Sequence, residues 1–156
     1  MISNPKPVRE RFGIRFSIVA RRWRRELDAS LAAVGLSDAT WTPLVHLDET
    51  GGGISQKQLA SLVGVDASTL VRLVDILEQK AWITRRPDEN DGRSRLVYLT
   101  EEGRVQVRHI RAQLEQAEKA LLEGIGDEEL ASTLSFIDEL DSRLLAAQRL
   151  RTGGEQ

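Results

Sequence analysis

The feature that most constrains the fold is a pair of short helical patterns in residues 54–79, followed at once by a strand pattern. Ser55 and Gln58 form a capping box, which predicts the start of the first helix. Gly64 interrupts this helix, because Gly adopts the left-handed conformation that a sharp turn needs. Asp66 is expected to cap the second helix, whose apolar residues recur at helical spacing: Leu70, Leu73, Val74 and Leu77. These residues predict a helix-turn-helix.

A β-hairpin pattern follows the second helix. The runs WITRRP and RLVYLT are rich in β-prone residues, and a polar loop at residues 88–94 with an Asp-Gly pair joins them. Ile54 is expected to add a very short edge strand to the same sheet. A helix-turn-helix joined to a basic hairpin is a winged helix. The expected fold class is therefore mainly α with a small β-wing, a winged helix-turn-helix flanked by N- and C-terminal dimerisation helices.

At the wing the sequence resembles a known family. Asp91, Arg93, Leu99, Thr100 and Gly103 fill the wing pattern of the MarR family of bacterial transcription regulators, and more narrowly of its SlyA-like branch. The run LVRLVDILEQKAWITRR resembles the family's recognition helix and its exit into the wing. The run GIGDEELASTLSFIDEL resembles the family's final helix, so the resemblance covers nearly the whole chain.

Ala81 departs from the family pattern, which usually has Gly after the recognition helix. If this position is left-handed, Ala costs on the order of 1 kcal/mol there, because its Cβ crowds the backbone. We expect the fold to tolerate that cost.

Apolar residues at helical spacing also flank the winged helix. Before it they predict one long amphipathic helix that ends near Gly35. Ser37 is expected to cap a second helix, in which Pro43 predicts a kink or a late start. After the wing, one helix is expected to open at Glu101 and a last one to be capped by Asp127. The apolar positions are Phe12, Phe16, Val19, Trp23, Leu27, Leu31 and Val34 before the wing, and Ile110, Leu114, Ala117, Leu121, Leu130, Leu134, Ile137, Leu140 and Leu144 after it.

These flanking helices carry more apolar surface than one small winged helix can cover. A homodimer that intertwines them is the expected solution, and the resemblance implies the same dimer. We therefore expect an N-terminal dimerisation helix at residues 1–36 and a winged helix-turn-helix DNA-binding domain at residues 37–100. C-terminal dimerisation helices are expected at residues 101–156.

Composition excludes several classes of function. The 156 residues include no cysteine, which excludes disulfides, thiolate metal sites and thiol-based peroxide sensing. Neither a membrane span of roughly 18 apolar residues nor a signal peptide is evident, so a cytoplasmic protein without membrane contact is expected. The net charge of −2 combines opposite arms: residues 6–26 hold eight basic side chains against two acidic, and residues 112–148 hold nine acidic against two basic. The acidic arm either offsets a basic working face elsewhere or pairs with the basic arm.

The second helix of the helix-turn-helix is expected to read double-stranded DNA. Arg72 can bond a guanine edge in the major groove with both arms of its guanidinium. The alternative for Arg72 is a surface salt bridge with Asp75 or Glu78. The hydroxyls of Ser68 and Thr69 suit phosphates or bases, or they only cap the helix.

The wing tip is expected to enter the minor groove. Arg93 would sense the negative potential of A·T-rich sequence there, and Asp91 would hold its guanidinium, as the resemblance also implies. The alternative is a plain loop salt bridge between the two residues. A dimer with these parts should prefer an inverted repeat with half-sites about 10 bp apart. The expected phosphate contacts are Arg85, Arg86 and Arg95, of which Arg86 has Asp88 as an alternative partner.

The resemblance implies a ligand crevice between the dimer arms and the winged helix. Its expected walls are Trp23, Trp41 and His46, with Arg72 at the edge. An aromatic slot with one cation would suit a small aromatic or phenolic acid, whose binding would shift the spacing of the recognition helices. Trp41 matches the SlyA-like pattern, whereas His46 falls one residue late, which turns its ring by about 100° unless Pro43 resets the register. The alternative is that the tryptophans are core or interface residues and His46 a surface histidine.

Catalysis has no support, and neither a cofactor nor a metal is expected. His46 and His109 lie on different predicted helices, and the glycines at 51–53 lack the Lys-Ser/Thr pair of a nucleotide-binding loop. Two rivals of a ligand-responsive regulator are an architectural DNA binder that counteracts nucleoid silencing and a winged-helix protein-interaction module. The second rival predicts that Arg72 and Arg93 can be replaced by Ala without functional loss. The sequence leaves target genes, effector and repressor versus activator open.

Overall fold

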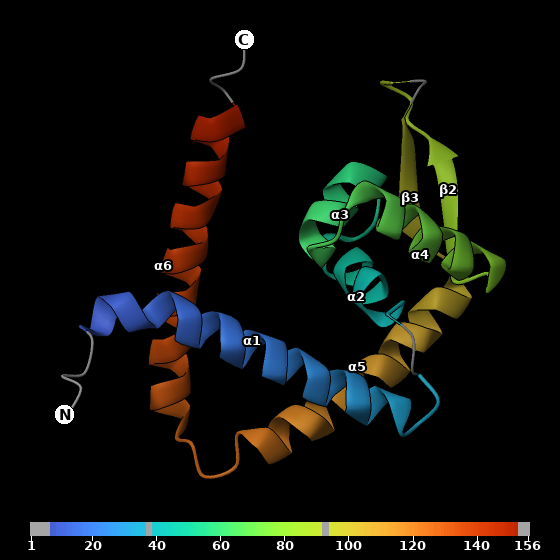
Figure 1. Ribbon diagram of the computed structural model, residues 1–156. Coiled ribbons are helices and arrows are strands. Elements are labelled where there is room, and N and C mark those ends of the chain that lie inside the picture. Colours follow the sequence, from blue (N-terminus) through green and yellow to red (C-terminus); the bar gives the residue numbers. More distant parts are fainter. Residues whose placement is uncertain (1–6, 37–38, 92–93, 153–156) are drawn as a thin grey trace. The chain divides into compact units, whose positions relative to one another are not determined.

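The helices and strands follow one another in the predicted order (Figure 1). The computed structural model describes residues 7–36, 39–91 and 94–152. Its elements are α1 (Val8–Ala32), α2 (Trp41–Thr50), β1 (Ile54–Ser55), α3 (Gln56–Val63), α4 (Ala67–Gln79), β2 (Ile83–Pro87), β3 (Arg95–Leu99), α5 (Glu101–Leu121) and α6 (Asp127–Thr152). The chain divides into two compact units, residues 1–118 and residues 119–156. Across the described ranges, no helix combines the length and the apolar character needed to cross a membrane. The mainly α fold class with a small β-wing is confirmed.

The helix-turn-helix, α3 and α4, begins and ends as its local sequence predicts. The Gln58 amide donates to Ser55 Oγ at 3.2 Å, and the Ser55 amide donates to Gln58 Oε1 at 2.9 Å, which completes the capping box. Gly64 ends α3 in the left-handed conformation, with φ of 76°. Asp66 then caps α4 by accepting a bond from the Thr69 amide at 2.9 Å.

The end of α4 contains a left-handed alanine. Ala81 has φ of 58°, the only non-glycine residue with positive φ among those described. Its amide donates to the Glu78 carbonyl at 2.9 Å, and the Trp82 amide donates to the Leu77 carbonyl at 3.0 Å. These two bonds form the helix-ending motif that usually has Gly at its left-handed position. The predicted departure at Ala81 is therefore a site of backbone strain.

Replacing Ala81 by Gly is expected to raise the free energy of unfolding by roughly 0.5–1 kcal/mol. Gly removes the Cβ clash of the left-handed residue and so stabilises the folded state. Part of this stabilisation is offset, because Gly also gives the unfolded chain more conformational freedom. Urea unfolding followed by circular dichroism measures the change. The matched control is Ala112→Gly at an exposed interior position of α5, where the same substitution should destabilise by about 1 kcal/mol. If both variants lose stability, Ala81 is not a site of backbone strain.

The wing is a three-stranded antiparallel sheet with the order β1-β3-β2. β2 pairs with β3 in the register Ile83↔Leu99, Arg85↔Val97 and Pro87↔Arg95. β1 pairs with β3 through Ile54↔Val97, which confirms the predicted edge strand. The alternation of a strand places Ile83, Val97 and Leu99 in the core and Arg86 on the opposite, exposed face. Arg95 shares the face of Val97 but is exposed at the start of the strand.

The wing joins α5 through a tight contact between Thr100, Gly103 and the end of α4. Thr100 Oγ1 donates to the Ala81 carbonyl at 2.7 Å and accepts from the Gly103 amide at 3.0 Å. The Thr100 amide donates to the Trp82 carbonyl at 3.1 Å. Gly103 is buried and lies directly against that carbonyl. The threonine and glycine of the wing pattern thus have a structural reason, since together they turn the chain from β3 into α5.

The helix α2 starts late. It begins at Trp41 after the cap residue Thr40, so Pro43 lies in the first turn, where its missing N–H leaves no hydrogen bond unmade. Of the two predicted alternatives, a kink or a late start, the late start is confirmed. Ser37, the predicted cap, lies outside the described residues. The helix starts further along the chain than that prediction placed it.

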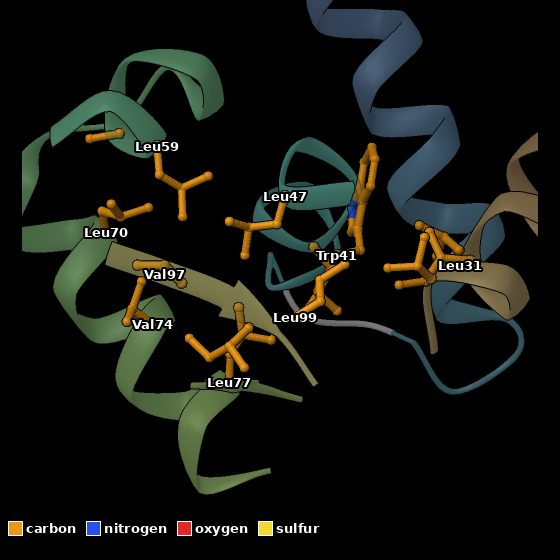
Figure 2. Close-up of a cluster of buried hydrophobic side chains, with 14 of the residues drawn as sticks. Leu31, Trp41, Leu47, Leu59, Leu70, Val74, Leu77, Val97 and Leu99 are labelled. Atoms are coloured by element: carbon orange, nitrogen blue, oxygen red, sulfur yellow. The ribbon is translucent and has the colours of Figure 1, made fainter. Parts of the chain in front are cut away.

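One apolar core ties α1 and α5 to the winged helix. Leu31 of α1, Leu47 of α2 and Val97 of β3 are fully buried, and Figure 2 shows such side chains converging from α1, α2, α3, α4 and β3. Ile110 of α5 belongs to the same cluster, with Leu114 packed against it. Burial of this cluster removes apolar surface from water, the main stabilising contribution to such a fold.

Other apolar side chains of the two long terminal helices remain exposed in the single chain. On α1 these include Val8, Ile14 and Val19, and Ile14 is 68% exposed. On α6, in the second unit, Leu134 is 59% exposed, Leu144 is 53% exposed and Leu150 is 81% exposed. These exposed apolar side chains are available to pack against a partner.

Candidate nucleic-acid interface and crevice

The first turn of α4 is a hydrogen-bonded cap centred on Asp66. Thr69 Oγ1 donates to Asp66 Oδ2 at 2.7 Å, and Ser68 Oγ donates to Asp66 Oδ1. The hydrogen bond from Ser68, followed by those from Thr69, holds the pKa of the Asp66 carboxyl well below its usual range. Both hydroxyls therefore serve the cap, as one of the two predicted alternatives requires. A DNA contact by Ser68 or Thr69 stays a prediction.

Arg72 lies one turn further along α4, on its exposed surface. The predicted alternative, a salt bridge from Arg72 to Asp75 or Glu78, is wrong, because Arg85 pairs with both of these carboxylates. Within residues 7–36, 39–91 and 94–152, no ion pair engages Arg72. Its guanidinium is therefore available to a partner outside the chain.

Arg85 of β2 joins the wing to the helix-turn-helix. Its Nη2 lies 2.9 Å from Asp75 Oδ1, and its Nε donates to Glu78 Oε2 at 3.1 Å. Its Nη1 donates to Gln56 Oε1 of α3 at 3.4 Å. The hydrogen bond from Arg85 lowers the pKa of Glu78, and the same bond raises the pKa of Arg85. The predicted phosphate contact by Arg85 stays untested, but two of its nitrogens already bind carboxylates.

The wing tip presents the remaining basic residues. The Arg86 guanidinium lies over the Tyr98 ring at 5.0 Å from its centroid, and among the described residues no ion pair joins it to Asp88. Arg95 is exposed at the start of β3. At the loop, the Ser94 amide donates to the Asp91 carbonyl at 2.8 Å. Arg93, the predicted minor-groove residue, lies outside the described residues.

A crevice of about 660 Å³ opens between α1, α2 and α5. Trp23, Trp41 and His46 line it together, and their role in binding a ligand stays a prediction. Arg72 does not line it, which corrects its predicted place at the edge, because α4 packs elsewhere on the core. The described residues that line it are Trp23, Arg24, Leu27, Trp41, Thr42, Val45, His46, Glu49, Arg111, Leu114, Glu115 and Glu118.

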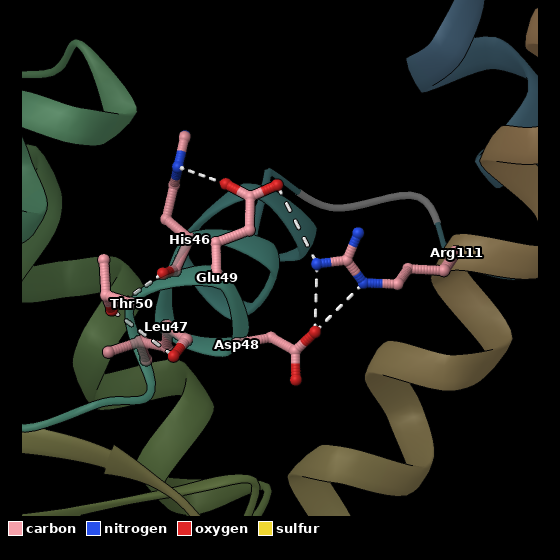
Figure 3. Close-up of polar contacts among 6 residues, drawn as sticks. All are labelled: His46, Leu47, Asp48, Glu49, Thr50 and Arg111. Carbon is pink, nitrogen blue, oxygen red and sulfur yellow. Dashed lines mark hydrogen bonds and ion pairs between the residues drawn. The ribbon is translucent and has the colours of Figure 1, made fainter.

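Arg111 of α5 is the first cation of the crevice, and sequence reasoning missed it. Its Nη2 lies 2.9 Å from Asp48 Oδ2 and 3.8 Å from Glu49 Oε1, and its Nε donates to Asp48 at 3.0 Å (Figure 3). On the other side of Glu49, His46 Nδ1 lies 3.5 Å from Glu49 Oε2. These contacts fix the end of α2 against α5.

Arg24 of α1 is the second cation, also missed at the sequence level. Its guanidinium lies 4.5 Å from the centroid of the Trp41 ring. Its Nε donates to Asp28 at 3.3 Å, and its Nη2 donates to Thr42 Oγ1. Trp41 Nε1 donates to the same Asp28 carboxylate at 2.8 Å. Trp41 is therefore a buried, hydrogen-bonded wall of the crevice, which combines the core and crevice interpretations of this residue.

The described residues contain no group of three or more His, Asp and Glu side chains that could hold a metal ion. The two arginines of the crevice are held by ion pairs and hydrogen bonds, whereas no ion pair among the described residues engages Glu115 or Glu118. This arrangement can bind an organic molecule through its aromatic walls and unpaired charges.

Comparison with known proteins agrees with this geometry. Residues 36–94 match the model of the MarR family. The solved transcriptional regulator PA3341 is 32% identical, with 86% of this chain and 98% of that chain covered and a TM-score of 0.77. A MarR family transcriptional regulator from Rhodococcus sp. RHA1 is 26% identical, with 87% and 96% covered and a TM-score of 0.76. CouR from Rhodococcus jostii RHA1, solved with p-coumaroyl-CoA bound, is 27% identical, with 87% and 95% covered and a TM-score of 0.72.

The solved structure of SlyA is 22% identical to this chain. At that level a likeness shows a common fold, so the SlyA-like branch stays a prediction. The family itself is shown by the match of the winged helix and by a relative that is 32% identical over nearly its whole length. The chain belongs to the MarR family of transcriptional regulators.

Proposed function

We propose that this protein is a homodimeric, sequence-specific regulator that binds an inverted-repeat operator and responds to a small aromatic molecule. The observation that carries the proposal is Arg72 on α4, which is exposed and has no ion pair with any described residue. It lies on the helix to which Arg85 ties the wing. A helix-turn-helix places the second helix in the major groove, where an arginine can bond both acceptors of a guanine edge. Arg86 and Arg95 of the wing would contact phosphates of the DNA backbone, and Arg93 would enter the minor groove.

The exposed apolar residues of α1 and α6 support the dimer. Ile14 and Leu134 are each more than half exposed in the single chain, and a second copy would remove such residues from water. In a two-fold dimer the recognition helices are related by symmetry, so each would meet one half of an inverted repeat.

The crevice supports the response to a ligand. Residues of α1, α2 and α5 line it. The helices α1 and α5 belong to the proposed dimerisation region, whereas α2 packs on the winged helix. A molecule bound there would favour the spacing of recognition helices that accommodates it, by as much as its affinity differs between the two spacings. The solved relative CouR holds p-coumaroyl-CoA, which supports a small-molecule response in this chain as well.

Selection of bound duplexes from a random DNA library tests the proposed function, with the purified chain at near-physiological salt. We expect enrichment of an A·T-rich inverted repeat with half-sites about 10 bp apart, bound by two copies of the chain. Salt-sensitive binding without enrichment would replace the proposal by an architectural role. An absence of binding would favour a protein-interaction module.

Arg85→Ala separates two roles of this arginine at the selected operator. We expect weaker binding with an unchanged slope of log K against log salt, because Arg85 holds the wing against α4 and its charge is already matched by Asp75 and Glu78. Arg95→Ala is the matched comparison, since an exposed phosphate contact should lower the slope by about 0.9 for each phosphate. Filter binding at several salt concentrations measures both. If the slope of log K against log salt falls equally in the two variants, Arg85 contacts a phosphate after all.

A further inference from the structure

Both cations of the crevice are already paired. The Arg111 guanidinium lies 2.9 Å from Asp48 and 3.8 Å from Glu49. The Arg24 guanidinium contacts Asp28 at 3.3 Å and stacks over Trp41. A carboxylate ligand would have to compete with a protein carboxylate for either guanidinium, and it would leave that side chain without its partner. Among the described residues that line it, the crevice therefore offers no free cation to an acidic ligand.

Two carboxylates of the crevice have no such partner. Glu115 and Glu118 lie three residues apart on α5 and line the crevice together. Arg111 precedes Glu115 by four residues, a spacing that permits a helical ion pair, yet its guanidinium turns to α2 instead. In the described part of the chain, no ion pair engages either glutamate.

The charge of the crevice is therefore negative. Three of its lining residues are glutamates and two are arginines, and Asp28 and Asp48 hold those arginines from the sides. The aspartates already match these two arginines, so the three lining glutamates leave the crevice with an excess of negative charge. A positively charged molecule gains attraction from this balance, and a negatively charged molecule is repelled.

The aromatic walls favour the same sign of charge. Indole rings present a negative face and attract cations. Trp41 already has the Arg24 guanidinium over its ring at 4.5 Å. Trp23 is half-buried, and among the described residues no cation lies over its ring. The volume of about 660 Å³ is in the usual range for sites that hold small organic molecules.

We propose that the crevice binds a lipophilic organic cation: an aromatic ring against Trp23, with an ammonium group between Glu115 and Glu118. This inference deepens the ligand-responsive part of the proposed function and reverses the charge expected from the sequence. The expected acid depended on Arg72 as a free cation at the edge, and Arg72 does not line the crevice. The cation would connect α1 to α5, so its binding would act on the terminal helices that hold the proposed dimer.

Calorimetric titration of the full chain, without DNA, tests the charge of the ligand. The two probes share one ring system: (naphthalen-1-ylmethyl)trimethylammonium carries a positive charge, and 1-naphthylacetate a negative charge. We expect the ammonium to bind at least about tenfold more tightly than the acetate. Equal or tighter binding of the acetate would overturn the proposal, and so would the absence of measurable binding by the ammonium.

A double variant, Glu115→Gln with Glu118→Gln, assigns the charge to these residues. It keeps the shape of both side chains and should remove the preference for the ammonium. Glu102→Gln, an exposed glutamate at the other end of α5, is the matched control and should leave the preference intact. A preference that survives the double variant would overturn the assignment to Glu115 and Glu118. Thermal unfolding followed by circular dichroism checks that each variant is folded.

Operator binding is measured separately, with no ligand present. If the ammonium binds but no operator is selected, the proposed function fails while the cation site stands. If an operator is selected but the acetate binds better, the cation proposal fails while the regulator stands. The double variant should bind the operator like the unmodified chain, because neither glutamate lies in the helix-turn-helix or the wing.

Discussion

Gly103→Ala is expected to lower the free energy of unfolding by at least about 3 kcal/mol. This is the largest effect on stability among our predictions. A Cβ at Gly103 would lie 1.9 Å from the Trp82 carbonyl oxygen and 2.9 Å from its carbon. Both atoms are backbone, so no side-chain rotation relieves the clash. The same carbonyl accepts from the Thr100 amide at 3.1 Å, so moving it away would also break the bond that joins β3 to the end of α4.

Chemical denaturation measures this effect, with Gly13→Ala as the matched control. Gly13 lies inside α1, and a Cβ there would meet no atom within 4 Å. The control should gain roughly 0.5–1 kcal/mol, because Ala favours a helix interior more than Gly does. If Gly103→Ala unfolds at the same denaturant concentration as the unmodified chain, the close contact with Trp82 is wrong. A Gly103→Ala chain that does not fold, beside a stable control, agrees with the prediction.

Helix boundaries could be predicted from the sequence because they depend on near neighbours. Ser55 and Gln58 are three residues apart, and Asp66 and Thr69 likewise, so each cap is complete within one turn. The late start of α2 follows from Pro43, since a proline is tolerated in the first turn and not in the interior. Core positions were predictable for the same reason, because helical spacing assigns Leu70, Val74 and Leu77 to one face.

Charge partners could not be predicted in this way, because they join residues far apart in the chain. Arg111 contacts Asp48, which is 63 residues away. The spacing along α4 made Asp75 and Glu78 candidates for Arg72, but the packing of β2 against α4 brings Arg85 to them instead. The sequence pattern showed which side chains are charged, and the fold decides which of them remain unpaired.

The same distinction explains the crevice. Trp23, Trp41 and His46 came from the resemblance to a family, and the structure brings them together. Arg24, by contrast, lies in a run of arginines on α1, and nothing in that run distinguishes the one that stacks on Trp41. The sign of the crevice charge depends on these pairings. The acid expected from the sequence rested on Arg72, which is not among the described residues that line the crevice.

Arg72→Ala is expected to weaken operator binding by roughly 10- to 100-fold per half-site and to flatten the preference at one base pair. Arg72 is exposed and has no ion pair among the described residues, so its removal should leave the stability of the fold unchanged. Arg72→Lys should recover only part of the affinity, because an ammonium cannot form both bonds of the guanidinium fork.

A charge control separates base reading from simple attraction to DNA in this experiment. Arg143→Ala removes one exposed positive charge from α6, outside the winged helix, and should change affinity little and sequence preference not at all. Competition binding with operators altered at each base pair measures both quantities. If Arg72→Ala instead weakens binding to every sequence equally, Arg72 contacts a phosphate and the base-reading role passes to another residue of the α4 face. If Arg72→Ala changes neither affinity nor sequence preference, the helix-turn-helix does not read DNA through this face. The protein-interaction module then becomes the better explanation, because that alternative alone predicts that Arg72 can be replaced without loss of function.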